Sequence, residues 1–198
     1  MNSSTTRRVS GGPVLQDDVT EAITDSFFEE LAAVGYGKLS IEAVAKRAGT
    51  GKAAVYRRWP SKQAMTVALV SGAAVAATST GDTGSLRGDV TQLLHEFTAA
   101  LRHPMTARIM PDLLAEATRN EGFAAALLAT IGNPRRENAG RIIRRAIERG
   151  ELPADTDVEL GLDFMVSPLY WRLVVTNFPT EDDYLERLVT KIVSALAA

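Results

Sequence analysis

A chain of 198 residues is long enough for one domain or two small ones with a hydrophobic core. Its 45% hydrophobic and 23% charged residues and its net charge of −2 predict a globular protein rather than a disordered one. The absence of cysteine excludes disulfides, thiolate metal sites and a cysteine nucleophile, and no apolar run suggests a membrane span, so we expect a cytoplasmic protein.

The N-terminal 16 residues predict a flexible arm, because they are rich in Ser, Thr, Gly and Arg. Arg7 and Arg8 could reach into a DNA minor groove, although a solvated tail is the simpler interpretation. A first helix is then predicted to end at Gly35, with apolar residues at helical spacing: Ile23, Phe27, Leu31 and Val34.

Two short helices joined by a glycine turn are predicted over residues 40–59. Ser40 is a suitable N-cap for the first of them, and Gly49 fits the left-handed position that ends it. Ala45 is small enough for two helices to cross closely, and Val55 supplies an apolar contact from the second helix. Small residue, glycine and apolar residue at these intervals indicate a helix-turn-helix.

The rest of the chain predicts further helices and no strand. A helix continues from Lys62 to about Thr78, and the Ser-, Thr- and Gly-rich residues 79–85 predict a linker. Five more helical segments follow, with a bend expected at Gly132-Asn133-Pro134 in the third of them: 86–101, 105–119, 123–149, 158–176 and 182–196.

Positive charge is concentrated at the predicted helix-turn-helix. Between Tyr36 and Lys62 there are seven cations and one anion, a net charge of +6 in a chain whose total is −2. A basic patch on an otherwise acidic protein is typical of a nucleic-acid interface.

The sequence AGTGKAAVYRRWPSK at residues 48–62 resembles the DNA-binding signature of the tetracycline-repressor (TetR) family, and the similarity covers roughly residues 17–69. Thr50 and Gly51 depart from it, because the family usually has Val and Ser there. The resemblance implies an all-α fold of about nine helices. It also implies an N-terminal three-helix helix-turn-helix domain, residues 17–78, and a larger C-terminal domain for dimerisation and ligand binding, residues 79–198.

The second helix of such a pair lies in the major groove with its N-terminal residues near base edges. Lys52 could donate to guanine or to a phosphate, and Ser40 could act as a cap alone. The resemblance assigns a phosphate contact to Tyr56, and the start of the next helix suits a phosphate at Lys62. The complete predicted DNA-binding set is Ser40, Thr50, Gly51, Lys52, Ala53, Tyr56, Arg57, Arg58 and Lys62.

Family members usually pair their last two helices into a homodimer, and the apolar residues of 158–176 and 182–196 suit this role, although a monomer core would look similar. The middle helices would surround a pocket for a small, largely apolar ligand. Core packing is the alternative for each member of the predicted lining, which is Phe97, Leu101, Met110, Leu114, Phe123, Leu127, Phe164 and Trp171.

No catalytic residue, metal site or cofactor is predicted. His95 and His103 are the only histidines and stand in no metal-binding pattern. The leading hypothesis is therefore a dimeric repressor that a small ligand releases from a palindromic, double-stranded DNA operator. The alternatives are a regulator or activator without an effector, and a small helical enzyme that uses the C-terminal pocket.

Overall fold

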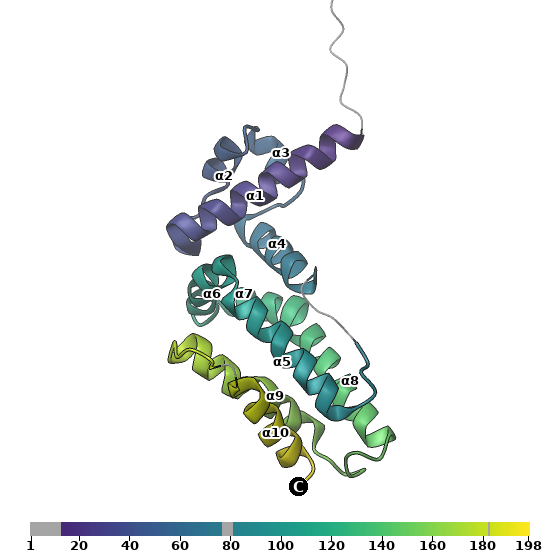
Figure 1. Ribbon diagram of the computed structural model, residues 1–198. Helices are drawn as coiled ribbons and strands as arrows, with labels where there is room; N and C mark the ends of the chain where they lie inside the picture. The colour runs from purple at the N-terminus through teal and green to yellow at the C-terminus, as the bar shows by residue number, and fades with distance from the viewer. Residues whose placement is uncertain (1–12, 77–80, 182) are drawn as a thin grey trace, which may run out of the picture. The chain divides into compact units, whose positions relative to one another are not determined.

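The computed structural model of the protein describes residues 13–76, 81–181 and 183–198. These residues are mostly helical and include no strand, which confirms the predicted all-α fold (Figure 1). The chain divides into two compact units, one that ends at Met65 and one from Thr66 to Ala198. None of the described helices is both long and apolar enough to cross a lipid bilayer.

The first unit contains α1 (Pro13–Lys38), α2 (Ile41–Arg47) and α3 (Lys52–Tyr56), together with the first turn of α4 (Lys62–Ala76). Each of these helices contributes buried apolar side chains: Ile23, Phe27, Leu31, Tyr36, Ile41, Val44, Ala45, Val55 and Met65. Because α4 begins in this unit and continues in the next, the units divide earlier than the domain boundary predicted between residues 78 and 79.

Helix α1 begins earlier than predicted. The expected arm covered residues 1–16, but the helix begins at Pro13. Proline suits a first helical position, because its fixed φ matches a helix and its missing N–H would have no helical partner there. Residues 1–12, including Arg7 and Arg8, lie outside the described part of the chain. The predicted end at Gly35 is confirmed by its φ of 74°, and a short turn then reaches Lys38.

The second unit contains the remaining helices: α5 (Leu86–Arg102), α6 (Pro104–Ala117), α7 (Glu121–Leu127), α8 (Asn133–Glu148), α9 (Val158–Tyr170) and α10 (Tyr184–Leu196). Helices α5 and α8 lie side by side, as do α9 and α10 (Figure 1). One hydrophobic core joins α5, α8, α9 and α10, and its fully buried members include Leu94, Ile143, Met165 and Leu169.

Two π-helical turns interrupt the helices of this unit, at Leu128–Gly132 and Trp171–Val175. The first joins α7 to α8 just before Pro134, where proline cannot donate to the regular α-helical ladder. It interrupts the regular α-helix next to Gly132-Asn133-Pro134, where an interruption or a bend is predicted. Because each π turn continues its neighbours without a break, the described residues form nine continuous helical runs, which agrees with the predicted total.

A buried carboxylate anchors the segment before α5. The side chain of Asp89 is fully buried and accepts hydrogen bonds from the backbone N–H and the hydroxyl of Thr83, both at 2.7 Å. Arg145 and Arg149 contact it at 3.3 and 3.4 Å. Burial by itself raises the pKa of Asp89, but the hydrogen bonds from Thr83 and the charge of the arginines outweigh it and hold the pKa below its usual value.

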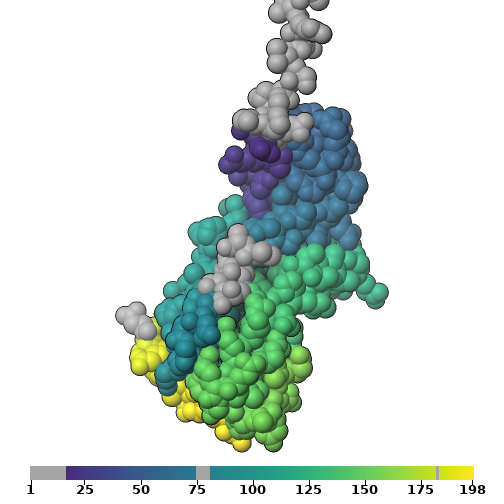
Figure 2. Space-filling view, turned by 90° about the vertical axis from the view of Figure 1, so that its right-hand side faces the viewer, coloured from purple at the N-terminus to yellow at the C-terminus, as the bar shows by residue number. Residues whose placement is uncertain are grey.

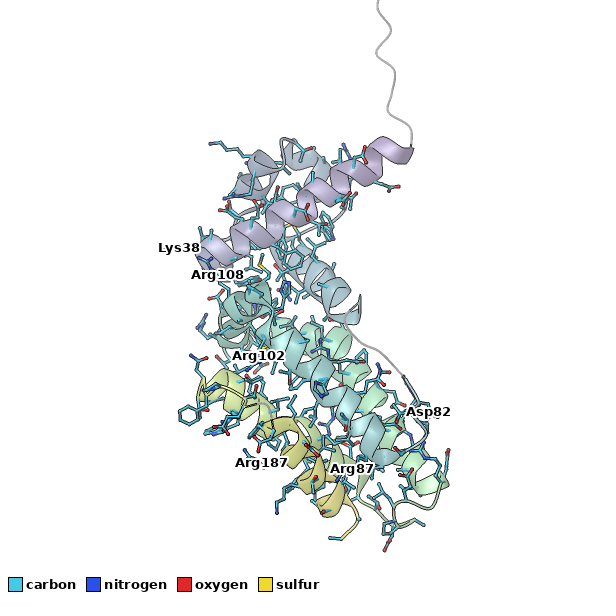
Figure 3. The ribbon with its side chains drawn as sticks, viewed as in Figure 1. Lys38, Asp82, Arg87, Arg102, Arg108 and Arg187 are labelled. Carbon is cyan, nitrogen blue, oxygen red and sulfur yellow. The ribbon has the colours of Figure 1, made fainter. Side chains whose placement is uncertain are left out.

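The same arginines bind Asp82, at 3.8 Å from Arg145 and 3.3 Å from Arg149. Figure 3 shows Asp82 on the segment that leads into α5. In Figure 2 this segment and the start of α5, in blue, lie against the green surface of α8. The predicted linker 79–85 is therefore tied to α8 over its described residues, 81–85.

Candidate nucleic-acid interface and ligand cavity

The turn between α2 and α3 is built on a left-handed glycine. Gly49 has a φ of 64°, and a Cβ added there would meet nothing within 4 Å, so the backbone angle alone favours glycine. The N–H of Thr50 donates to the carbonyl of Ala45 at 2.9 Å, and that of Gly49 donates to Lys46 at 3.3 Å. This Schellman pattern ends α2 and allows α3 to start in a new direction.

Small and apolar side chains close the contact between these helices. Ala45 is 2% exposed and Val55 is completely buried, as the helix-turn-helix spacing predicts. The hydroxyl of Ser40 accepts a hydrogen bond from the N–H of Ala43 at 3.1 Å, which confirms Ser40 as the cap of α2. A contact between Ser40 and DNA stays a prediction.

The outer face of α3 carries most of the predicted DNA-binding residues. Lys52, Ala53, Tyr56 and Arg57 are exposed, and Tyr56 keeps 49% of its surface accessible. The guanidinium of Arg57 has no hydrogen bond or ion pair with any residue that the structure describes. Arg57 therefore presents a full positive charge at the end of α3.

Gly51 is the N-cap of α3, and the helix starts without a side-chain cap. Its φ of −85° and ψ of 149° are angles that any residue adopts, and nothing lies within 4 Å of an added Cβ. Thr50, beside it, is half-buried. The departure of Gly51 from the family pattern thus leaves the first N–H groups of α3 without a hydroxyl partner from the cap.

Two of the predicted DNA-contacting cations have partners within the protein. Lys52 forms an ion pair with Glu42 of α2, and this hydrogen bond lowers the pKa of Glu42. Arg58 turns towards α1, where its Nε donates to the hydroxyl of Thr20 at 2.8 Å, and its Nη1 donates to the carbonyl of Ala54 at 2.9 Å. Arg58 thus holds α3 to α1.

Lys62 also has a different environment from the one predicted. Its ammonium donates to the carbonyl of Tyr36 at 2.9 Å and lies 4.4 Å from the centroid of the Tyr36 ring. A cation beside the last carbonyls of a helix is favourable, because these carbonyls carry partial negative charge. Lys62 therefore caps the end of α1, a role that its sequence neighbours do not reveal.

A further basic residue, Arg47, has a structural role that the sequence did not predict. Arg47 binds Glu30 at 2.8 Å and Glu29 at 3.4 Å, which ties α2 to α1. Four of the seven cations between Tyr36 and Lys62 therefore have partners among the described residues. The exposed remainder is Lys38, labelled in Figure 3, with Lys46 and Arg57.

A cavity of ≈ 250 Å³ lies in the second unit, lined by residues of α5, α8 and α9 and of the segment before α5. Its apolar lining includes Leu93 and Phe97 of α5 and Leu162 and Val166 of α9. Helix α8 contributes four arginines to it: Arg135, Arg136, Arg141 and Arg145.

Among the eight predicted ligand residues, Phe97 alone lines this cavity. Phe123 and Leu101 are buried, whereas Leu114, Phe164 and Trp171 are exposed. Met110 and Leu127 are half-buried outside the lining. Helical periodicity identifies apolar positions but does not distinguish a cavity wall from a core or an outer face, so the predicted residues and the lining of this cavity share Phe97 alone. The four arginines were missed because their stretch of sequence resembles a solvated helix face.

Large apolar side chains are exposed along α9 and the turns that follow it. This α9 surface consists of Leu160, Phe164, Trp171, Val175 and Phe178, and Trp171 is 62% exposed. The first four stand at spacings that keep them on one side of a helix. An exposed apolar surface of this kind is typical of an interaction site. The apolar stripe of α10, by contrast, packs into the core of its own unit through Val189, Ile192 and Leu196.

Within the described residues, no group of three or more His, Asp or Glu side chains could hold a metal ion. His95 and His103 are both exposed.

Two family models match the chain. The one described as bacterial regulatory proteins, tetR family, matches residues 23–69, and the one described as tetracyclin repressor-like, C-terminal domain, matches residues 80–192.

Individual proteins match over most of their length. The DNA-binding transcriptional repressor TetR of Mycobacteroides abscessus is 30% identical over 82% of this chain and 85% of its own. The HTH-type transcriptional regulator YdeS of Bacillus subtilis is 26% identical over 85% of both chains. The crystal structure of the TetR family regulator SCO0332 has a TM-score of 0.71 and 28% identity, and the match covers 91% of this chain and all of that one.

Proposed function

Because the chain belongs to the TetR family of DNA-binding transcriptional regulators, we propose that it is a dimeric repressor that a small molecule releases from a palindromic operator. The first unit would bind the DNA duplex, and the second would bind the ligand and pair with a second copy of the chain.

The exposed face of α3 beside the glycine turn is the observation that carries this proposal. Ala53 is short, so α3 can approach the base edges closely in the major groove. Tyr56 and Arg57 lie one turn further along, at a suitable distance for a phosphate or a guanine. Lys52 would have to exchange Glu42 for a DNA acceptor, whereas Arg57 has no such partner to leave.

The α9 surface supports the proposed dimer. A second α9 packed against Leu160, Phe164 and Trp171 would remove these side chains from water, which is favourable for apolar surface. Two copies related by a twofold axis would present two α3 helices to half-sites about one helical turn apart. The buried stripe of α10 makes α9 the main contributor to this interface.

The cavity supports the proposed ligand. A ligand that binds one arrangement of the dimer better than another shifts the population towards it, and it lowers operator affinity if that arrangement spaces the α3 helices wrongly. The cavity and the α9 surface both include residues of α9, so its occupancy and the dimer contact would both involve this helix.

Selection of DNA duplexes from a random pool on the purified protein tests the function. We expect an inverted repeat whose half-sites are centred about 10 base pairs, or a multiple of that, apart. Recovery of no preferred sequence would contradict a sequence-specific regulator, and recovery of a single half-site would contradict the dimer. Release by a ligand is then tested as loss of affinity for the selected duplex.

A further inference from the structure

The cavity of the second unit is apolar on one side and basic on the other. Leu93, Phe97 and Val166 belong to its apolar side. Glu96 also lines the cavity and accepts a hydrogen bond from Gln92 at 2.9 Å. The basic side comes from α8, at spacings that bring several residues to one helical face: Arg135, Asn138, Arg141 and Arg145.

Two of the arginines in the lining are already neutralised. Arg136 binds Glu159 and Asp163, both at 2.6 Å, on the side of α9. Arg145 binds the buried carboxylate of Asp89 at 3.3 Å. These pairs belong to the framework of the unit, and they leave little positive charge at either residue for a ligand.

The other two arginines lack a carboxylate partner among the described residues. The guanidinium of Arg135 donates to the carbonyl of Ala74 at 3.4 Å, and that of Arg141 donates to the side-chain oxygen of Asn138. Both arginines are only partly exposed. Burial lowers the pKa of Arg135, because its charged form has lost much of its water. The side chain nevertheless stays protonated at neutral pH, since arginine does not deprotonate in proteins.

A partly buried cation without a counter-charge has lost part of its hydration, so the binding of an anion from solution would be favourable there. A guanidinium presents paired N–H groups that match a carboxylate, and the apolar wall opposite favours a hydrocarbon body. The volume of ≈ 250 Å³ is slightly below the range of about 300–1,000 Å³ for small-molecule sites, so the body must be short.

Resting on the ligand-responsive function proposed for the second unit, we propose that the cavity binds a small amphipathic carboxylic acid in its ionised form. Its carboxylate lies at Arg135 and Arg141, and its apolar body lies against Leu93, Phe97 and Val166. This charge requirement differs from the largely apolar ligand that the sequence predicts.

Matched acids and alcohols test the charge requirement directly. The purified full-length protein, without DNA, is titrated with octanoate and 1-octanol, and with 4-phenylbutyrate and 4-phenyl-1-butanol, while the melting temperature and the heat of binding are measured. We expect the acids to raise the melting temperature and the alcohols not to, because only a ligand that binds the folded state stabilises it. Acetate, which lacks the body, should have no effect.

Variants then locate the carboxylate. Arg135→Gln keeps a polar amide but removes the charge and shortens the side chain, and it should weaken the binding of the acid at least about tenfold. Arg141→Gln should act in the same direction. Arg144→Gln is the matched control, because Arg144 lies on the same helix, binds Glu137 and is absent from the cavity lining.

Equal stabilisation by acids and alcohols would overturn the proposal, as would no binding of either acid or unchanged binding in both cavity variants. If Arg135→Gln does not fold, the acid–alcohol comparison in the unaltered protein still decides. An acid that binds through Arg135 without changing duplex affinity would refute only ligand release. A selected duplex that binds tightly while no acid binds would refute only the cavity assignment.

Discussion

At the residue scale, the basic patch of the first unit divides into structural and exposed cations. Arg47, Arg58 and Lys62 bind groups of α1, whereas Arg57 faces solvent. The composition of residues 36–62 predicts the patch correctly, but it cannot show this division. The partners, such as Tyr36 for Lys62, stand many residues away along the chain.

We expect Arg57→Ala to weaken binding to the selected duplex by roughly 5- to 150-fold, as for the loss of one good base or phosphate contact. The melting temperature should stay unchanged, because the Arg57 side chain binds no described residue. Fluorescence anisotropy at several salt concentrations measures both the affinity and its salt slope. Arg119→Ala, an exposed arginine of the second unit, is the control. If Arg57→Ala binds the duplex with unchanged affinity, Arg57 is not part of the interface.

Lys62→Ala, unlike Arg57→Ala, should make the protein less stable. Loss of the contacts with the Tyr36 carbonyl and ring should lower the free energy of unfolding by about 1 kcal/mol. Thermal unfolding followed by circular dichroism measures this change without DNA. An unchanged melting temperature, together with weaker duplex binding, would instead support the phosphate contact predicted from the sequence.

Asp89 should make the stability of the second unit dependent on pH. Its pKa is lower in the folded state than in the unfolded chain, so its contribution is complete above the unfolded pKa of about 4. That contribution is lost as the pH falls towards the folded pKa. In unfolding curves between about pH 3 and pH 7, the difference between the native protein and Asp89→Asn should therefore shrink at low pH. A constant difference would show that ionisation of Asp89 is irrelevant.

At the element scale, local chemistry explains most helix ends. Ser40, Gly35 and Gly49 bound the helices where capping rules place them. The rules did not predict the start at Pro13, because the surrounding composition resembles that of a disordered tail. They also did not predict the basic lining of the cavity, since it depends on which face of α8 turns towards α5 and α9.

The N-cap residue of α3, Gly51, has no side chain that could accept a hydrogen bond from the start of the helix. Gly51→Ser should stabilise the protein by a few tenths of a kcal/mol, because its hydroxyl can accept from the first N–H groups of α3. Gly51→Ala adds the same Cβ without the hydroxyl and should destabilise it. Melting temperatures of the three proteins test the order. A higher value for the alanine variant would contradict the assignment of Gly51 as the cap.

At the scale of the whole molecule, the proposed dimer rests on the exposed α9 surface. The sequence shows that residues 158–176 are apolar on more than one side, but only the structure separates the buried side, with Met165 and Leu169, from the exposed one. The structure likewise shows that the apolar stripe of α10 is buried in the core of its own unit.

Trp171→Glu should convert the proposed dimer into a monomer, because a charge at the centre of an apolar interface loses its water on association. Light scattering after gel filtration gives the mass directly. Leu114→Glu, an exposed apolar position on α6, should leave the mass unchanged. If the Trp171→Glu protein is still a dimer, the interface does not lie on α9.

The ion pair between Lys52 and Glu42 places a carboxylate beside Lys52, the first residue of α3. Any duplex that approaches meets this negative charge together with the lysine. If Lys52 binds DNA as proposed, the DNA acceptor must displace this carboxylate, and a phosphate with its full negative charge would replace the lost ion pair better than a neutral base edge. The net gain from a DNA contact of Lys52 would therefore be smaller than that from a contact of Arg57, which has no ion pair with a described residue to give up.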